Sequence, residues 1–425
     1  MNRTTIVAAS LLSCATAATA QSSVTLFGVV DVGVSYYSAR SDFYNNTASP
    51  VIAQPGVTRS QTALSNSGTS NSRLGFRGTE DLGGGLAAGF WLESAMTPDN
   101  GAAAMAFNRR STVGLSGPFG EIRLGRDFTP TFWNDSVFSP FSTIGVGANV
   151  VSTVGTNLQV ARGPGSLAAA SDNYLRTSNS IGYFLPPNLG GIYGQLQYAL
   201  HENVSQSNLP GSPSGKGRYF GGRLGYAAGP LDVALAYGES TAADTTGVNA
   251  AGLRTGVNLD EKIKTLNLGA SYDFGFVKIF GEVSQVADRA LSTAPVPVLG
   301  LVTLRDSDKY KGGLLGITVP VGAGLIKAAY SRVKFDNDLG PQATSLTPRR
   351  DASVSKLAIG LDYNLSKRTA LYATAARIRI KDGQNNPAIM GAVTGGVTYL
   401  STGAGTSGFA PRSSTGYDFG IRHAF

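Results

Sequence analysis

Apolar and polar side chains alternate with a period of two along almost the whole of this 425-residue chain. The first such stretch shows the pattern: one parity holds Val24, Leu26, Val30, Val32 and Val34, and the other holds Thr25, Asp31, Gly33 and Ser35. Successive side chains of a strand point to opposite faces, so the alternation predicts strands with one apolar and one polar face. A soluble sheet protein would show the same alternation.

The connections between the predicted strands distinguish a membrane barrel from a soluble sheet protein, because two kinds of connection alternate along the chain. Seven are short and rich in Gly, Pro, Asp or Asn, at residues 80–84, 117–120, 186–190, 228–230, 273–275, 321–324 and 364–367. Eight are long and polar, near residues 38–70, 96–107, 128–173, 201–216, 241–261, 287–308, 334–353 and 380–414, and none contains a convincing helix or strand. Together they join sixteen strands, and this even count with asymmetric loops is typical of outer-membrane barrels.

Hydropathy agrees with strands as the membrane-crossing elements. After residue 20 no stretch approaches the 18 consecutive apolar residues that a membrane helix requires. Only closed barrels satisfy the backbone of strands in lipid. We therefore predict an all-β fold, a 16-stranded antiparallel transmembrane β-barrel with short periplasmic turns and long outer loops, with both termini on the short-turn side. A soluble periplasmic protein is the alternative.

Residues 1–20 are predicted to be a secretory signal peptide, and residues 21–425 the barrel domain. Arg3 provides the positive start, residues 6–12 are apolar except for Ser10, and Ala-Thr-Ala precedes Gln21. The only cysteine, Cys14, lies within that segment, so a chain starting at Gln21 would have no disulfide, thiolate metal site or cysteine nucleophile. A lipoprotein is the alternative, because Leu-Leu-Ser-Cys at residues 11–14 resembles a lipid-attachment site.

Charge and histidine content narrow the function classes. The formal net charge of +8 is compatible with an anion path or with lipopolysaccharide contact. No basic run or aromatic RNA-reading motif indicates nucleic acid. The two histidines, His201 in a predicted outer loop and His423 near the periplasmic end, would lie on opposite sides of a membrane. We therefore predict no enzyme, no cofactor and no metal site.

Aromatic residues and the last strand support the barrel. Tyr36, Tyr37, Phe90, Trp91, Tyr198, Tyr237, Tyr272, Phe274, Tyr330, Tyr363, Tyr372 and Tyr417 lie near predicted strand ends, where interfacial girdles occur. The chain ends in an amphipathic stretch, residues 416–425, closed by Phe425. This ending resembles the signal by which the barrel-assembly machinery recognises its substrates.

Several sequence blocks resemble the general, non-specific trimeric porins of Gram-negative bacteria, especially the β-proteobacterial branch. They are residues 22–31, 72–86, 107–110, 113–116, 119–120, 124–126 and 179–183. The resemblance implies a homotrimer in the cell outer membrane, through which small hydrophilic solutes diffuse passively. It also implies that the third outer loop, following Arg126, folds inward to narrow the lumen. Arginines on the barrel wall would then face acidic groups across the passage.

Carried onto this chain, the pattern predicts a pore constriction with basic and acidic members. Arg73 and Arg77 share a parity opposite to that of Leu74 and Phe76, so both should point into water. The basic candidates are Arg73, Arg77, Arg109, Arg110 and Arg126, of which the family pattern favours Arg109 over Arg110. The acidic candidates are Asp135 on the loop, Glu93 on the third strand and Asp31 on the first, with Asp135 leading.

Departures from the family pattern point to a more cationic constriction. Arg110 and Asp127 stand where the family commonly has Gln, and residues 128–173 contain few acids. Charged walls select the sign of passing ions, so we predict a preference for anions. The alternative interpretation of each arginine is a solvated charge in the lumen or in a loop that has no special role. An enzyme barrel, an adhesin and a substrate-specific channel are the alternative functions, and bilayer conductance separates the first two from a general pore.

Overall fold

The computed structural model describes residues 23–45, 52–102, 105–162, 173–202, 215–248, 254–296, 300–337, 351–401 and 407–425. The predicted signal, residues 1–20, lies outside these ranges. The strands are β1 (Ser23–Asn45), β2 (Val57–Asn66), β3 (Arg73–Gly83), β4 (Leu86–Ala95), β5 (Arg110–Gly117), β6 (Gly120–Phe128), β7 (Arg176–Phe184), β8 (Ile192–Ala199), β9 (Tyr219–Ala228), β10 (Leu231–Val248), β11 (Arg254–Asp273), β12 (Lys278–Val296), β13 (Gly300–Val321), β14 (Gly324–Asn337), β15 (Ser353–Asn364), β16 (Thr369–Lys381) and β17 (Ser407–Ala424). The helices are α2 (Pro130–Val137), α3 (Val150–Arg162) and α4 (Pro387–Met390).

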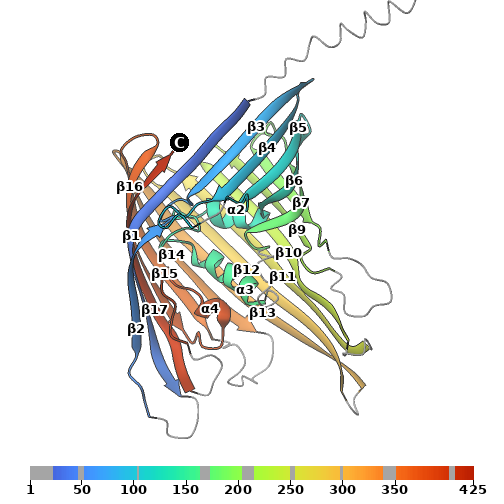
Figure 1. The fold of residues 1–425 in the computed structure, drawn as a ribbon, viewed down its shortest axis with the longest axis vertical. Coiled ribbons are helices and arrows are strands. Elements are labelled where there is room, and N and C mark those ends of the chain that lie inside the picture. Colours follow the sequence, from blue (N-terminus) through green and yellow to red (C-terminus); the bar gives the residue numbers. More distant parts are fainter. Residues whose placement is uncertain are drawn as a thin grey trace, which may run out of the picture.

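The strands form one closed antiparallel sheet, in which β1 pairs with β17 (Figure 1). Seventeen segments occupy sixteen positions, because β2 and β3 are one interrupted strand. β2 pairs with β1 from Val32 to Ser41, and β3 pairs with β1 from Ser23 to Val29. The predicted sixteen-stranded barrel is therefore confirmed, with an excursion at residues 67–72 that divides the second strand.

All seven predicted short turns join neighbouring strands of the barrel. The long connections are where the prediction was partly wrong. Strands β10 to β13 contain 18, 20, 19 and 22 residues, so they extend through much of the stretches 241–261 and 287–308. β2 lies within 38–70, α2 and α3 lie within 128–173, and α4 and the start of β17 lie within 380–414. Polar outer strands carry no apolar periodicity, which is why the alternation missed them.

The outward face of the wall is apolar over its middle. Large aliphatic side chains such as Val113, Leu315 and Ile359 are more than half exposed there, because they face the surroundings of the barrel rather than its interior. Tyrosines 36, 198, 272, 330, 363 and 417 also face outward, as predicted for aromatic girdles. Tyr372 was wrongly assigned to a girdle: it is buried inside the barrel and donates to Asp31. Trp91 also lies on an inner-wall hollow.

The third long connection folds into the barrel, as expected. Thr129 caps α2, its hydroxyl accepting from the Phe132 amide, and Pro130 occupies the first turn. Helix α2 packs against β8–β11, and α3 packs against β13–β15 and α4 (Figure 1). Val150, Val154 and other apolar side chains of α3 form a buried core with the inward side chains of that wall. The loop is therefore attached to one side of the barrel.

Closure of the barrel involves the C-terminal residue. The Gly28 amide donates to the Phe425 carbonyl, and the Phe425 amide donates to the Gly28 carbonyl, both at 3.1 Å. A Cβ at position 28 would lie 2.8 Å from the Arg73 carbonyl oxygen and 2.3 Å from the Phe425 ring, so a larger residue would require the backbone to shift. Both ends of the barrel wall therefore lie on the short-turn side, as predicted. In the described part of the chain, no helix has the length and hydropathy to cross a membrane.

Candidate pore constriction

Arginines gather on the inner wall where β3, β4, β5 and β6 run side by side. Strand pairing sets Arg77 opposite Trp91, Trp91 opposite Thr112, and Gly114 opposite Arg123. These positions share the inward parity, whereas the residues between them, such as Val113, face outward. We call Arg73, Arg77, Arg109, Arg110 and Arg123 the arginine cluster.

Glu93 on β4 is the shared partner of two arginines of this cluster. The Arg109 Nε lies 2.5 Å from the Glu93 Oε1, and the Arg73 Nε lies 3.8 Å from the same oxygen. The Trp91 Nε1 donates to the Glu93 Oε2 at 3.2 Å. Glu93 is 6% exposed, so a single buried carboxylate orders two guanidiniums and an indole.

Trp91 also supports two further guanidiniums through its ring. The Arg110 Cζ lies 4.6 Å from the Trp91 ring centroid and the Arg77 Cζ lies 5.3 Å from it. The Arg77 Cζ is 5.6 Å from the Phe27 ring. The negative face of an aromatic ring attracts a cation without neutralising it. Arg77 is exposed and has no carboxylate partner among the residues that the structure describes.

Two other carboxylates, Glu121 and Asp127, contact the remaining part of the cluster. Arg123 contacts Asp127 at 2.6 Å and Glu121 at 2.8 Å, and its Cζ lies 4.0 Å over the Phe184 ring. The Arg110 Nε lies 3.8 Å from Asp127 and donates to the Thr112 hydroxyl at 3.1 Å. Arg123 is therefore held from two sides, and Asp127 is shared between two arginines.

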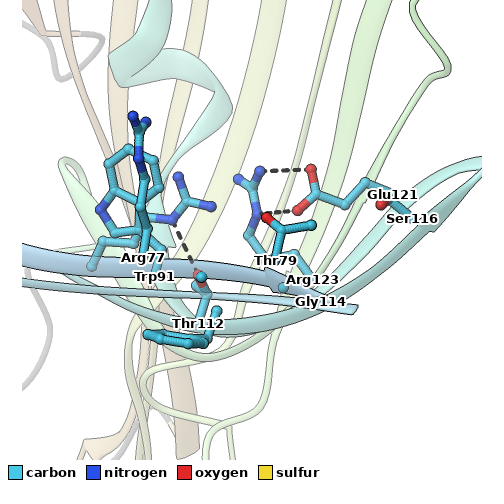
Figure 2. Close-up of a pocket in the computed structure, with 12 residues that line it drawn as sticks. Arg77, Thr79, Trp91, Thr112, Gly114, Ser116, Glu121 and Arg123 are labelled. Atoms are coloured by element: carbon cyan, nitrogen blue, oxygen red, sulfur yellow. Dashed lines mark hydrogen bonds and ion pairs between the residues drawn. The ribbon is translucent and has the colours of Figure 1, made fainter. Parts of the chain in front are cut away.

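Part of the arginine cluster, together with Trp91 and Glu121, lines a hollow of about 400 Å³ on the inner wall (Figure 2). Arg77, Arg110 and Arg123 reach it from three strands, and Glu121 is its only carboxylate among the lining residues. The whole cluster brings five guanidiniums together with three carboxylates, Glu93, Glu121 and Asp127. The local excess of positive charge favours an anion over a cation at this wall.

The structure brings together Arg73, Arg77, Arg109, Arg110 and Glu93 of the predicted constriction residues. Arg126 does not join them. Its strand position is opposite Ser111, between inward residues Gly125 and Asp127. Its Nε donates to the Asn108 carbonyl at 2.7 Å, and its guanidinium donates to the Ser178 hydroxyl at 2.8 Å. Arg126 therefore braces the β5–β6–β7 rim on the other face.

Asp135 and Asp31 also lie apart from the cluster, and both are 0% exposed. Asp135 on α2 accepts from the Tyr174 hydroxyl and from the Asn267 side chain on β11. Burial raises the pKa of this carboxyl, which faces the wall that carries the loop. Asp135 therefore attaches α2 to the barrel instead of facing the arginine cluster.

Asp31 has a different structural task. Its carboxylate accepts from the amides of Gly68, Thr69 and Ser70 and from the Tyr372 hydroxyl at 2.6 to 3.2 Å. These donors belong to the excursion between β2 and β3 and to β16. Asp31 therefore fixes the interruption of the second barrel strand.

The inward loop itself carries few acids. Between residues 129 and 162 the only carboxylate is Asp135. The loop is fixed there by polar contacts such as Arg223 Nε to Asn134 Oδ1 at 2.5 Å and Asn149 Nδ2 to Glu282 Oε2 at 2.7 Å. The passage thus has an arginine-rich wall on one side and a loop with its carboxylate turned away on the other.

Arg123, Glu121 and Trp91 belong to the site and were missing from the predicted constriction. The signal that would have found them is the alternation itself. Glu121, Arg123, Gly125 and Asp127 share one parity, while Ile122 and Leu124 take the other, apolar parity. The prediction named Arg126 instead, because this residue lies next to the inward loop in the sequence.

A closed barrel with an apolar outside, a charged inside and an inward loop defines a membrane channel of the outer-membrane type. A model of the Gram-negative porin family matches residues 4–383, and the chain belongs to this family. It is an outer-membrane porin that forms a channel. Its family and structural neighbours are channels.

Two relatives and one solved structure cover most of the chain. Outer membrane porin protein 32 of Delftia acidovorans is 36% identical over 422 residues, which is 99% of both chains. An outer membrane porin protein of Bordetella pertussis is 28% identical, covering 88% of this chain and 93% of the relative. The solved anion-selective porin from Comamonas acidovorans superposes with a TM-score of 0.68 at 34% identity, covering 95% of this chain and all of that one.

Among the described residues no group of three or more His, Cys, Asp or Glu side chains could hold a metal ion. His201 follows β8 at its long-loop end, and His423 lies at the short-turn end of β17, where its Nδ1 is 2.9 Å from the Thr369 hydroxyl. The two imidazoles therefore occupy opposite ends of the barrel.

Proposed function

We propose that this porin lets small hydrophilic solutes diffuse passively across the outer membrane and prefers anions. The arginine cluster carries this proposal, because five guanidiniums meet three carboxylates on one wall of the lumen. The constriction then consists of Arg73, Arg77, Arg109, Arg110 and Arg123, with Glu93, Glu121 and Asp127. The protein acts as a channel and catalyses no reaction.

The physical basis is a long-range field with no tight binding site. A low-dielectric wall strengthens the interaction between a guanidinium and a passing ion, and the arginines stay in place through aromatic rings that leave their charge available. Passage requires shallow wells. Support also comes from the solved relative of Comamonas acidovorans, which is an anion-selective porin.

The test is the reversal potential of the purified protein in planar bilayers under a salt gradient. Arg77→Gln combined with Arg110→Gln should lower the anion-to-cation permeability ratio by about 30-fold, because each charge contributes roughly 1 kcal/mol at a few ångströms in water. The matched control is Arg377→Gln with Arg379→Gln, two arginines whose strand parity is outward. An unchanged reversal potential in the first variant would remove the cluster from the selectivity mechanism.

We propose a homotrimer whose subunits meet across the low wall at β4, β5 and β6. These strands contain 10, 8 and 9 residues, whereas β13 contains 22. A tilted strand needs about 9–11 residues to span hydrocarbon, so a neighbouring subunit would shield this wall best. Leu124→Arg on the outer face of β6 should convert trimers into monomers in detergent, while Leu315→Arg on β13 should leave the trimer intact; analytical ultracentrifugation distinguishes them.

Other proposed partners are the solutes themselves, lipid and lipopolysaccharide around the wall, and the barrel-assembly machinery acting on the last strand. β17 places outward side chains Tyr417, Phe419 and Ile421 before the terminal Phe425. Phe425→Ala should slow assembly in cells without changing the conductance of the channels that form. We also propose that residues 1–20 are a cleaved signal peptide, which the N-terminal sequence of purified protein tests.

A further inference from the structure

The last long connection folds back into the barrel, as the third one does. Its residues 383–400, which include α4, lie beside α3 on the long-loop side of that helix (Figure 1). We call residues 383–400 the last-loop segment. Ala388, Ile389 and Ala392 are all 0% exposed, although the sequence predicts a polar outer loop here. The segment therefore belongs to the packed interior of the barrel.

The last-loop segment contacts the inward third loop directly. The Asn157 Nδ2 on α3 donates to the Ala388 carbonyl at 3.1 Å. Ile389 belongs to the same buried core as Val154 and Leu158 of α3. On its other side α3 packs against β13–β15. The helix is therefore held between the barrel wall and α4.

The position of the last-loop segment is itself fixed by the wall. The Tyr310 hydroxyl on β13 donates to the Asn386 Oδ1 at 3.1 Å. The Thr394 amide donates to the Ser414 hydroxyl on β17, also at 3.1 Å. Both Asn386 and Thr394 are buried. The segment thus spans the inner wall between β13 and β17 and has anchors that do not involve α3.

The α3 helix depends on these neighbours for its shape. It has 13 residues, and a helix of this length is marginal in water even when its residues favour helix. Its sequence, VVSTVGTNLQVAR, contains four valines, two threonines and a glycine, which are weak helix formers. Packing on the wall and on α4 therefore supplies the stability that the sequence of α3 lacks.

We propose that the last-loop segment is a second element of the constriction, which fixes α3 through Asn157 and Ile389 and so sets the largest solute that can pass. This inference rests on the proposed function, because the width of the lumen matters only to an open channel. Residues 383–400 include no Lys, Arg, Asp or Glu. The segment should therefore act on the size of solutes, while the arginine cluster acts on their charge.

The first experiment compares Ile389→Ala with Met390→Ala in planar bilayers. Ile389 is fully buried, whereas its neighbour Met390 is half-buried and serves as the matched control. Single-channel current is recorded with neutral polyethylene glycols of increasing size, and the largest polymer that still enters and reduces the current gives the width. Ile389→Ala should conduct more and admit larger polymers, because α3 loses its support. Met390→Ala should match wild type.

A thiol reporter gives the size of the effect. Val154 on α3 is 1% exposed, so Val154→Cys should be protected from an impermeant thiol reagent. Adding Ile389→Ala should speed its modification by about 30-fold or more, the usual effect of emptying a buried isoleucine site on a local opening equilibrium. An unchanged rate of modification would show that Ile389 does not hold α3.

A disulfide between α3 and α4 separates positioning from general stability. Gly391 has a φ of −75°, and a Cβ there would lie 3.0 Å from the Asn157 Cγ. The Cβ atoms of residues 157 and 391 would therefore lie within about 4.5 Å, the range for a disulfide. Asn157→Cys and Gly391→Cys are introduced together into Ile389→Ala, and mass spectrometry verifies the bond. Oxidation should return the conductance and the polymer limit to wild-type values, and reduction should reverse this.

Three results would overturn the inference. They are a wild-type width in Ile389→Ala, an equal widening in Met390→Ala, and a disulfide that forms without restoring the width. If Ile389→Ala fails to assemble, Asn157→Ala with Tyr310→Phe removes only two hydrogen bonds and should widen the passage to a smaller extent. A wild-type polymer limit in that double variant would then contradict the inference.

Reversal potentials of the same preparations separate this inference from the proposed function. Wild-type protein that prefers anions, together with an Ile389→Ala variant that keeps its width, overturns the role of the last-loop segment alone. Wild-type protein that conducts without preferring anions overturns the proposed selectivity alone, because the polymer limits still report the width.

Discussion

The arginine cluster lies inside the barrel on β3–β6, whereas a second group of basic side chains lines a hollow of about 650 Å³ on the outside of β1 and β14–β17. We call this second group the basic patch: Arg40, Arg332, Arg377, Arg379, Lys381 and Arg412. The two groups differ in what surrounds the charge. Inside, Glu93, Glu121 and Asp127 together with Trp91 and Phe184 hold the guanidiniums in a fixed arrangement. Outside, three of the arginines have no carboxylate within the described chain. Carboxylates and aromatic rings of the protein hold the first group, whereas Arg332, Arg377 and Arg379 of the second are exposed to the surroundings of the barrel.

The first way to break this comparison is to remove one carboxylate from each region. Glu93→Ala should lower the free energy of unfolding by about 3–5 kcal/mol, because it leaves partly buried guanidiniums without their shared anion. Asp42→Ala on the patch should cost about 0–1 kcal/mol, since its ion pairs are solvated. Urea unfolding in lipid vesicles measures both. Equal losses would show that burial does not distinguish the regions.

The second difference is electrical. Asp127→Asn removes a negative charge between Arg110 and Arg123, so the anion-to-cation permeability ratio should rise by about fivefold. Asp42→Asn should leave this ratio unchanged, because its side chain belongs to the outer patch. Reversal potentials under a salt gradient give both values. A shift caused by Asp42→Asn would mean that the patch influences the lumen.

Salt concentration gives a weaker test of the same distinction. Screening shortens the range of the field from about 30 Å at 0.01 M to about 3 Å at 1 M salt. The preference for anions should therefore decrease as salt rises and should persist in part, since the cluster borders a narrow hollow. A preference independent of salt would indicate a steric origin. The measurement is the reversal potential at a fixed tenfold gradient and increasing mean concentration.

Much of the barrel could be predicted from residues alone, because both the alternation and the turn residues are local signals. Gly83, Gly229 and Gly322 sit at turns with positive φ, which explains why the seven turns were correctly found. The helices α2 and α3 were missed, since they are stabilised by packing inside the barrel more than by their own periodicity. The long outer halves of β10–β13 were missed because both of their faces carry polar side chains, so the sequence there does not alternate between apolar and polar residues.

The residues of the constriction could be predicted only where the alternation of inward and outward side chains along a strand was used. Arg73 and Arg77 were assigned by alternation, and the structure places both in the cluster. Arg126 and Asp135 were assigned by nearness to the loop, and neither joins it. The partners of Asp135, Tyr174 and Asn267, are distant in sequence, so its direction depends on the tertiary fold. Arg123 was within reach of the same parity argument and was overlooked.

The central claim is that neighbouring residues of one strand meet water in the lumen and hydrocarbon outside. It is tested most directly at Thr112 and Val113 on β5, of which Thr112 lines the hollow and Val113 is 56% exposed on the outer face. The only natural cysteine is Cys14 in the predicted signal, so Thr112→Cys and Val113→Cys each introduce a single reporter. Both are reconstituted in bilayers and treated with a membrane-impermeant, charged thiol reagent.

The reagent should modify Thr112→Cys and reduce its single-channel current, and it should leave Val113→Cys unmodified with its current unchanged. Modification of Val113→Cys by a lipid-soluble maleimide would verify that its thiol is reactive. Equal modification of both positions by the charged reagent, or a current that ignores modification at position 112, would contradict the alternation on which the channel depends.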